Sequence, residues 1–275
     1  MSIFESITVA KMKRSQLVVL LLFIALVVIL FVDFDVKGDI PAAPKKKLPN
    51  QPGIVLTFDD DYVDTWYNAE KELRPYNWKA TFFICKYSAF TPEQKEKLHY
   101  LQNMGHDIAG HGYNHENAVK YAAQYGLDAY IKNEILPLKE IMRKDGFDIK
   151  SFAYPDGARN SQLDKRLLKY FDFIRGTTYG ELRPEAQYCY YENKRVIYGL
   201  GIDEDYEQFN LEYYKSLLLY AKKHNKIVIF YGHKTVDKVN DRLETPIGLL
   251  KQLCAFAIEN NLKFYSVDDL KNLEK

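Results

Sequence analysis

The chain has 275 residues, and its 38 basic and 37 acidic residues leave a formal net charge of +1. The chain therefore lacks the excess of basic residues that is typical of nucleic-acid-binding proteins. Its charge also gives no reason to expect a strongly anionic partner. Apolar residues make up 47% of the chain, which is enough for a sizeable core, and the predicted elements form one alternating series. We therefore expect a single folded domain after the N-terminal segment.

An uninterrupted apolar run extends from Leu17 to Val32, with basic residues before it and acidic residues after it. The basic flank predicts that residues 1–16 stay in the cytoplasm and that the chain after residue 33 is exported. The run is slightly shorter than the about 20 residues that span a hydrocarbon core, and no small-residue cleavage site follows it directly. We expect an uncleaved signal anchor at 17–32, with signal-peptide cleavage near Ala42 or Ala43 as the alternative.

Residues 33–52 are interpreted as a linker. The stretch from 38 to 53 contains four prolines and three consecutive lysines, and it has little to bury. This composition is typical of a semi-rigid tether. A folded domain is predicted from 53 to 275.

Within that domain, short apolar runs alternate with stretches of helical spacing. Strands are predicted at 54–58, 79–84, 106–109, 150–154, 226–231 and 263–266, and helices at 64–74, 92–104, 118–144 and 211–224. Thr91, Pro92 and Gln94 supply an N-cap, a first-turn proline and a capping box, and Thr245 with Pro246 is expected to cap a last helix. The alternation predicts an α/β fold with a mostly parallel sheet, closed or nearly closed.

Chemically reactive side chains follow several predicted strands. Asp59, Asp60 and Asp61 follow the first, and His111 and His115 follow the third. Pro155–Gly157 follows the fourth, and Gly232-His233 follows the fifth. Chemistry collects at the C-terminal strand ends of such folds. Three adjacent carboxylates repel one another, and a bound cation would offset that repulsion. Two histidines four residues apart can bind one metal ion. Taken alone, the aspartates also fit a solvated turn, and His233 also fits a buried structural histidine.

Five motifs, in order along residues 53–270, resemble the polysaccharide deacetylases of the NodB-homology type, carbohydrate esterase family 4. The segments are Thr57-Phe-Asp-Asp-Asp61, His111-Gly-Tyr-Asn-His115, Phe152-Ala-Tyr-Pro-Asp-Gly157, Asp205-Tyr206 and Phe230-Tyr-Gly-His233. The resemblance implies a distorted (β/α) barrel of the NodB-homology type. It also implies a hydrolase that removes N-acetyl or O-acetyl groups from a cell-envelope or extracellular polysaccharide.

Carried over to this sequence, the resemblance implies one role for each motif residue. Asp60, His111 and His115 would bind one divalent metal, commonly zinc. Asp59 would be the general base and His233 the general acid. Asp205 would orient His233, and the backbone N–H of Asp156 would stabilise the oxyanion. Tyr113, Tyr154, Tyr206 and Tyr231 lie within the motifs and are predicted either to line a sugar cleft or to pack in the core.

Three positions depart from the family pattern. Asp61 stands where the family has glycine, a position expected to need a positive φ, which aspartate tolerates. Ala153 stands where many members have an arginine that steadies the base, and Tyr206 replaces a tryptophan. None of these changes removes a predicted ligand or proton carrier.

Two alternatives to an active deacetylase stay open. One is a catalytically inactive, membrane-anchored glycan-binding module, suggested by the departures at Asp61 and Ala153. The other is a non-haem iron oxygenase, because two histidines and one carboxylate also form that metal triad. The three cysteines are interpreted as structural because no Cys-x-x-Cys pair occurs. No role is assigned to His99, His106 or His224.

Overall fold

The computed structural model describes residues 51–273 of the chain. The predicted signal anchor at 17–32 and all but the end of the predicted linker therefore lie outside the described residues. Within residues 51–273, no helix has both the length and the apolar character needed to cross a membrane.

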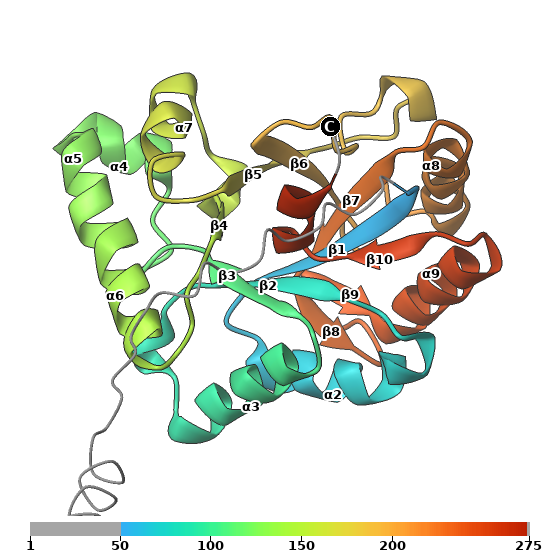
Figure 1. Cartoon of the computed structure of the whole chain (residues 1–275), viewed down its shortest axis with the longest axis horizontal. Helices are drawn as coiled ribbons and strands as arrows, with labels where there is room; N and C mark the ends of the chain where they lie inside the picture. The colour runs from blue at the N-terminus through green and yellow to red at the C-terminus, as the bar shows by residue number, and fades with distance from the viewer. Residues whose placement is uncertain (1–50, 274–275) are drawn as a thin grey trace, which may run out of the picture. The chain divides into compact units, whose positions relative to one another are not determined.

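Parallel strands form a closed barrel, in which β7 returns to pair with β1 (Figure 1). The strands follow the order of the chain around the barrel: β1 (Gly53–Asp60), β2 (Ala80–Ile84), β3 (Asp107–Gly110), β4 (Ser151–Ala153), β5 (Phe173–Thr178), β6 (Val196–Gly201) and β7 (Ile227–Gly232). Strand β10 (Lys263–Tyr265) pairs with the first half of β1, and β2 pairs with its second half. The predicted parallel (β/α) barrel is confirmed.

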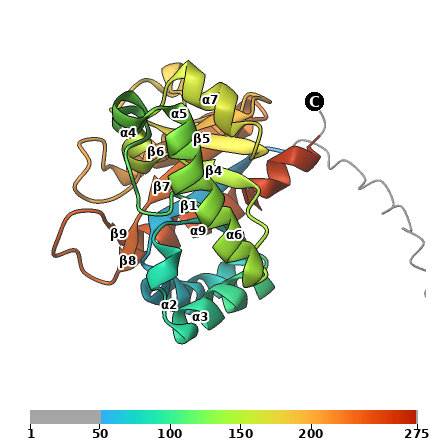
Figure 2. The same cartoon turned by 90° about the vertical axis from the view of Figure 1, so that its left-hand side faces the viewer.

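Helices surround this barrel, and the two views in Figures 1 and 2 show α2 and α3 side by side on one flank. The helices are α2 (Val63–Leu73), α3 (Pro92–Asn103), α4 (Ala118–Tyr125), α5 (Leu127–Tyr130), α6 (Leu136–Lys144), α7 (Ser161–Leu167), α8 (Leu211–Lys223) and α9 (Ile247–Glu259). A π-helical turn, Ile131–Ile135, joins α5 to α6. Strands β8 (Lys234–Val236) and β9 (Glu244–Pro246) form a separate small sheet.

Burial explains why the strongest sequence signals were predicted correctly. Strand β1 is buried along seven of its eight residues, and β2 is buried throughout. Parallel strands covered on both faces are expected to be continuous apolar runs. The capping box at Thr91 is also present, since its hydroxyl accepts from Gln94 N while the Gln94 side chain accepts from Thr91 N.

The structure corrects the sequence prediction in three places. The single helix predicted at 118–144 is interrupted at Gly126, which has φ +93 and separates α4 from α5. Helix α7 and strands β5 and β6 were not predicted. In the two strands, glycines and the buried Arg175 interrupt the apolar pattern. Thr245 does not cap α9: the N-cap is Pro246, without a side-chain bond, and the Thr245 hydroxyl donates to Asp203 instead.

Candidate active site

Three predicted metal ligands meet at the C-terminal ends of β1 and β3, which lie on either side of β2 in the barrel. Asp60 ends β1, while His111 and His115 lie in the loop that follows β3. The Nε2 atoms of His111 and His115 lie 3.5 and 3.2 Å from Asp60 Oδ1, and one ligand atom from each residue falls within 4.8 Å of the others. The structure therefore brings together the carboxylate and the two imidazoles that the sequence singled out.

The two distances from Asp60 Oδ1 fit a tetrahedral metal. Ligand bonds of about 2.0–2.1 Å place two tetrahedral donors about 3.3–3.4 Å apart. The Nδ1 atom of His111 lies 2.9 Å from the carbonyl oxygen of Ala153, to which it can donate. That bond fixes the tautomer that leaves Nε2 free to bind a metal, which is the usual outer-shell arrangement of a metal-binding histidine.

The pKa of Asp60 reflects the same contacts. Burial alone would raise the pKa of this carboxyl group, but the side chains of His111 and His115 outweigh burial and hold its pKa well below the ordinary value. Asp60 therefore stays ionised and available as an anionic ligand across the physiological pH range.

Asp59 is a buried carboxylate that forms an ion pair with Arg175. The two side chains are 4% and 1% exposed, and the guanidinium Nη2 donates to Asp59 Oδ2. The other oxygen, Oδ1, has no hydrogen-bond partner among the described residues. Arg175 lies on β5 directly beside Ala153 on β4, so the cation expected at position 153 is supplied by the neighbouring strand.

His233 is oriented by Asp203, and the role predicted for Asp205 is wrong in this respect. The Nδ1 atom of His233 lies 2.5 Å from Asp203 Oδ2, and Asp203 Oδ1 accepts the backbone N–H of His233 at 3.1 Å. Asp205 instead accepts from Arg242 and from the backbone N–H of Leu243. Asp203 lies opposite His233 because it comes two residues after the end of β6, which pairs with β7.

The environment of His233 favours the imidazolium form. Burial would lower the pKa of this histidine, but the hydrogen bond and charge of Asp203, together with the charges of Asp59 and Asp60, outweigh burial and raise its pKa. His233 is thus arranged to hold a proton, which is what a general acid requires.

Several site residues have strained backbones. Asp60, His115 and Asp156 have φ values of 88°, 66° and 57°. Aspartate and histidine enter this region more readily than most residues, although such conformations cost about 1–3 kcal/mol each. The positive φ expected at Asp61 falls on the preceding residue, Asp60, so the strain lies at a predicted metal ligand.

The four motif tyrosines divide into two groups. Tyr154 and Tyr231 are 1% and 2% exposed, so both pack in the interior rather than line an open cleft. Tyr154 donates to Asp164, while Tyr231 meets the ring of His233 edge-on at 5.7 Å. Tyr113 and Tyr206 are half-buried and remain available at the surface.

His106 and the three cysteines, to which no catalytic role was assigned, are buried in the fold. His106 is buried and lies 3.1 Å from Glu70, which also accepts from Trp78. All three cysteines are free and buried, as predicted. Cys85 lies near the site, with Sγ 3.9 Å from Asp60 Oδ1.

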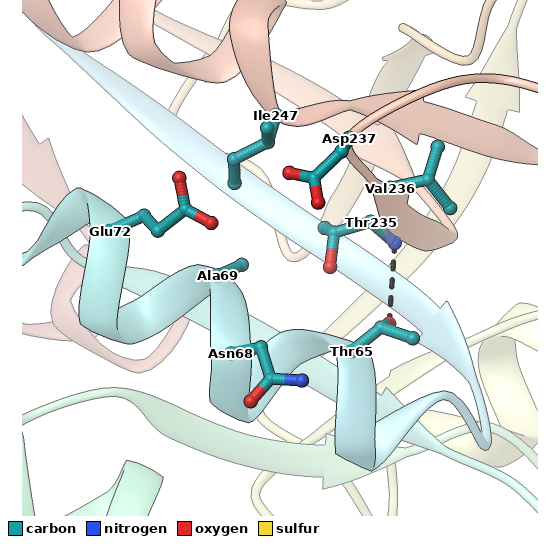
Figure 3. Close-up of a pocket in the computed structure, with 8 residues that line it drawn as sticks. All are labelled: Thr65, Asn68, Ala69, Glu72, Thr235, Val236, Asp237 and Ile247. Atoms are coloured by element: carbon teal, nitrogen blue, oxygen red, sulfur yellow. Dashed lines mark hydrogen bonds between the residues drawn. The ribbon is translucent and has the colours of Figure 1, made fainter.

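A small pocket of about 210 Å³ lies between α2, β8 and the start of α9 (Figure 3). Thr235, two residues after His233, lines it and donates its backbone N–H to Thr65 Oγ1 at 3.3 Å. The residues that line this pocket include no predicted metal ligand or proton carrier. We therefore place the chemistry at the strand ends and not in this pocket.

Part of the chain is similar to a family of known proteins. Residues 46–170 match the family model described as polysaccharide deacetylase, and this segment contains Asp59, Asp60, His111 and His115. This segment, slightly under half of the chain, is similar to the polysaccharide deacetylases. A bifunctional xylanase/deacetylase of Pseudobutyrivibrio xylanivorans is 29% identical over 133 residues, which are 48% of this chain and 21% of that protein. The chain thus matches only about a fifth of this curated relative.

Solved structures share the fold of this chain. A family 4 acetyl xylan esterase from Clostridium thermocellum, in complex with a cobalt ion, superposes with a TM-score of 0.54 at 16% identity, over 80% of this chain and 92% of that one. The Xyl-CE4 domain of a multidomain xylanase from the hindgut metagenome of Trinervitermes trinervoides gives a TM-score of 0.51 at 19% identity, over 80% and 90%. At these identities the likeness concerns the fold alone.

Proposed function

We propose that the chain is a metal-dependent hydrolase that removes acetyl groups from a polysaccharide. The observation that carries this proposal is the cluster of Asp60, His111 and His115, with Asp59 and His233 at the ends of the strands beside it. Zinc is the metal we propose, because a carboxylate and two imidazoles at this spacing suit it. When bound, such an ion polarises the acetyl carbonyl group and lowers the pKa of a water molecule.

The side chains supply the proton transfers of this reaction. Asp59 has an unpartnered oxygen, Oδ1, that can accept a proton from the attacking water. The water oxygen bonds to the acetyl carbon, and the bond from that carbon to the glycan nitrogen or oxygen breaks. His233 gives its proton to the departing atom, so that acetate and a free amine or hydroxyl group leave. The backbone N–H of Asp156, in the loop after β4, is proposed to donate to the developing oxyanion.

The substrate class is proposed from chemistry and from the relatives together. The nearly balanced charge of the chain suits a glycan without strong negative charge. The half-buried rings of Tyr113 and Tyr206 are proposed to contact the apolar faces of its sugars. A relative described as a xylanase/deacetylase and a neighbour described as an acetyl xylan esterase support an acetylated carbohydrate.

Acetate release tests the proposal. We expect the full chain to release acetate from at least one member of a panel of acetylated chitin-type, peptidoglycan, exopolysaccharide and xylan substrates. A chelator should stop release, and added zinc should restore it. Elemental analysis should find about one equivalent of metal in the wild type and a large loss in His111→Ala and His115→Ala. Full metal content in both variants would show that the site is misassigned.

The same assay separates the alternatives. A glycan-binding module would bind the acetylated glycan without releasing acetate, whether or not metal is present. A non-haem iron oxygenase would require iron and would oxidise a co-substrate. The ion pair between Asp59 and Arg175 favours the hydrolase, because it provides the steadied base that the Ala153 departure called into question.

We further propose that the deacetylase domain is held at a membrane, outside the cytoplasm, by residues 17–32. The apolar run with its basic flank supports this topology. Fractionation should recover the chain with membranes, and protease added outside intact cells should reach the domain. A soluble exported product that begins near residue 44 would show signal cleavage, whereas a protected cytoplasmic domain would overturn the topology.

A further inference from the structure

A buried carboxylate outside the five motifs holds the loop that carries the two histidine ligands. Glu134 is 0% exposed and lies in the π-helical turn between α5 and α6. Its Oε2 atom accepts the backbone N–H of Asn114 at 2.9 Å and that of Glu116 at 3.4 Å. Its Oε1 atom accepts from Asn114 Nδ2 at 2.7 Å. One side chain therefore binds three donors within and next to the segment from His111 to His115.

The backbone on both sides strengthens this attachment. The N–H of Tyr113 donates to the carbonyl oxygen of Glu134 at 3.1 Å. Gly112 has φ +91, and a Cβ atom there would lie only 3.1 Å from Glu134 Oε2. A glycine allows the backbone to approach the carboxylate this closely in this conformation. The loop that carries His111 and His115, here called the ligand loop, thus contacts both the backbone and the side chain of Glu134.

Packing alone does not account for a glutamate at this position. The buried stripe of this helical segment otherwise consists of Tyr130, Ile131, Ile135 and Leu138. Within residues 51–273, no lysine, arginine or histidine forms an ion pair with Glu134, although buried carboxylates are usually paired. An apolar side chain would fill the stripe without the cost of burying a charge. The N–H groups of the ligand loop are the partners that compensate for that cost.

The helix changes its geometry where Glu134 lies. The N–H of Leu136 bonds to the carbonyl oxygen of Ile131, five residues earlier, which defines the π-helical turn. Single π-helical turns within α-helices occur frequently at functional sites. The distortion here coincides with the one residue of the helix that contacts the ligand loop through its side-chain carboxylate.

We propose that Glu134 is the positioning residue of the metal centre, and that its carboxylate holds residues 111–116 in the conformation in which both imidazoles face Asp60. This inference rests on the proposed function, which includes the metal. Without the carboxylate, a metal ion would have to order the loop as it binds, and that ordering reduces affinity. Loss of an outer-shell partner typically weakens metal binding by about 10- to 100-fold.

Zinc affinity of the full chain tests this role, measured by competition with a chromophoric chelator. Glu134→Ala should bind zinc about 10- to 100-fold more weakly than the wild type. Glu134→Gln should lose less, because its amide oxygen can still accept from the two backbone N–H groups. The matched control is Glu70→Gln, since Glu70 is also buried but contacts Trp78 and His106 instead of the ligand loop. That variant should unfold at a lower temperature and bind zinc as the wild type does.

Hydrogen exchange provides a second readout that needs neither metal nor activity. Peptides covering residues 111–117 should exchange faster in Glu134→Ala than in the wild type or in Glu70→Gln. A merely structural role would change the melting temperature without this local effect.

The outcomes separate the two levels of the proposal. A wild-type chain that binds no zinc overturns the proposed function and the role of Glu134 with it. A wild type that binds zinc, beside a Glu134→Ala that binds it equally well, overturns only the positioning role. Equal losses of affinity in Glu134→Ala and Glu70→Gln would also overturn it, because general destabilisation would then suffice. If Glu134→Ala does not fold, unchanged exchange and affinity in Glu134→Gln count against the role.

Discussion

Asp59→Asn is expected to keep its metal while its deacetylase activity falls by about 10² to 10⁴, the usual scale for losing a positioned proton-transfer group. The metal should stay because Asp59 is not among the three clustered donors. The activity should fall because an amide cannot take a proton from the attacking water. Metal content and acetate release, measured on the same preparation, check both halves of this expectation.

The neighbouring carboxylate offers a matched control. Asp61 adjoins the site but belongs neither to the donor cluster nor to the ion pair with Arg175. Asp61→Asn should therefore release acetate at close to the wild-type rate. Since Asp59→Asn leaves the buried Arg175 without its charged partner, its stability should be measured by urea unfolding, so that activities are compared on folded protein. An Asp59→Asn chain as active as the wild type would refute the role of general base.

Asp203→Asn is expected to lower activity by roughly 10²-fold or more and to move the basic limb of the pH profile to lower pH. Asp203 Oδ1 accepts from both the Thr245 hydroxyl group and the His233 backbone N–H. The single oxygen of asparagine must serve those two donors, so its NH₂ group faces His233 Nδ1 and donates to it. The imidazole then has a neutral donor where it had a carboxylate partner, and the imidazolium form loses its stabilisation.

The direction of the pH shift follows from the raised pKa of His233. A general acid works while it is protonated, so activity is present below the pKa of His233 and is lost as pH rises through it. In the wild type the pKa of His233 is raised, since the contact with Asp203 outweighs the opposing effect of burial. Removing that carboxylate lowers the pKa, and the basic limb moves down with it.

Asp205→Asn is the control for this experiment. Asp205 is two residues away and contacts Arg242 and Leu243 rather than His233. Its replacement should leave the basic limb where it is in the wild type. If Asp205→Asn moved the limb and Asp203→Asn did not, the assignment drawn from the structure would be wrong and the one drawn from the sequence motif would be right.

The sequence by itself predicted the parallel β/α barrel and the three donor residues that the structure brings together. Fully buried parallel strands are continuous apolar runs, so Gly53–Asp60 and Ala80–Ile84 could be recognised without any tertiary information. Asp60, His111 and His115 could be assigned together because each lies in a short motif next to such a strand. In parallel β/α folds, the strand ends converge on one face.

Only the tertiary structure decided which charged groups meet across strands. Arg175 lies 116 residues from Asp59, and its strand was obscured by glycines that break the apolar pattern. Asp203 and Asp205 lie two residues apart after β6, and only the pairing of β6 with β7 selects Asp203 as the partner of His233. One feature of Glu134 could have been recognised in the sequence, namely that a glutamate lies among the apolar positions of a predicted helix. What it binds depends on a loop twenty residues earlier, because such contacts are set by packing between elements and not by local pattern.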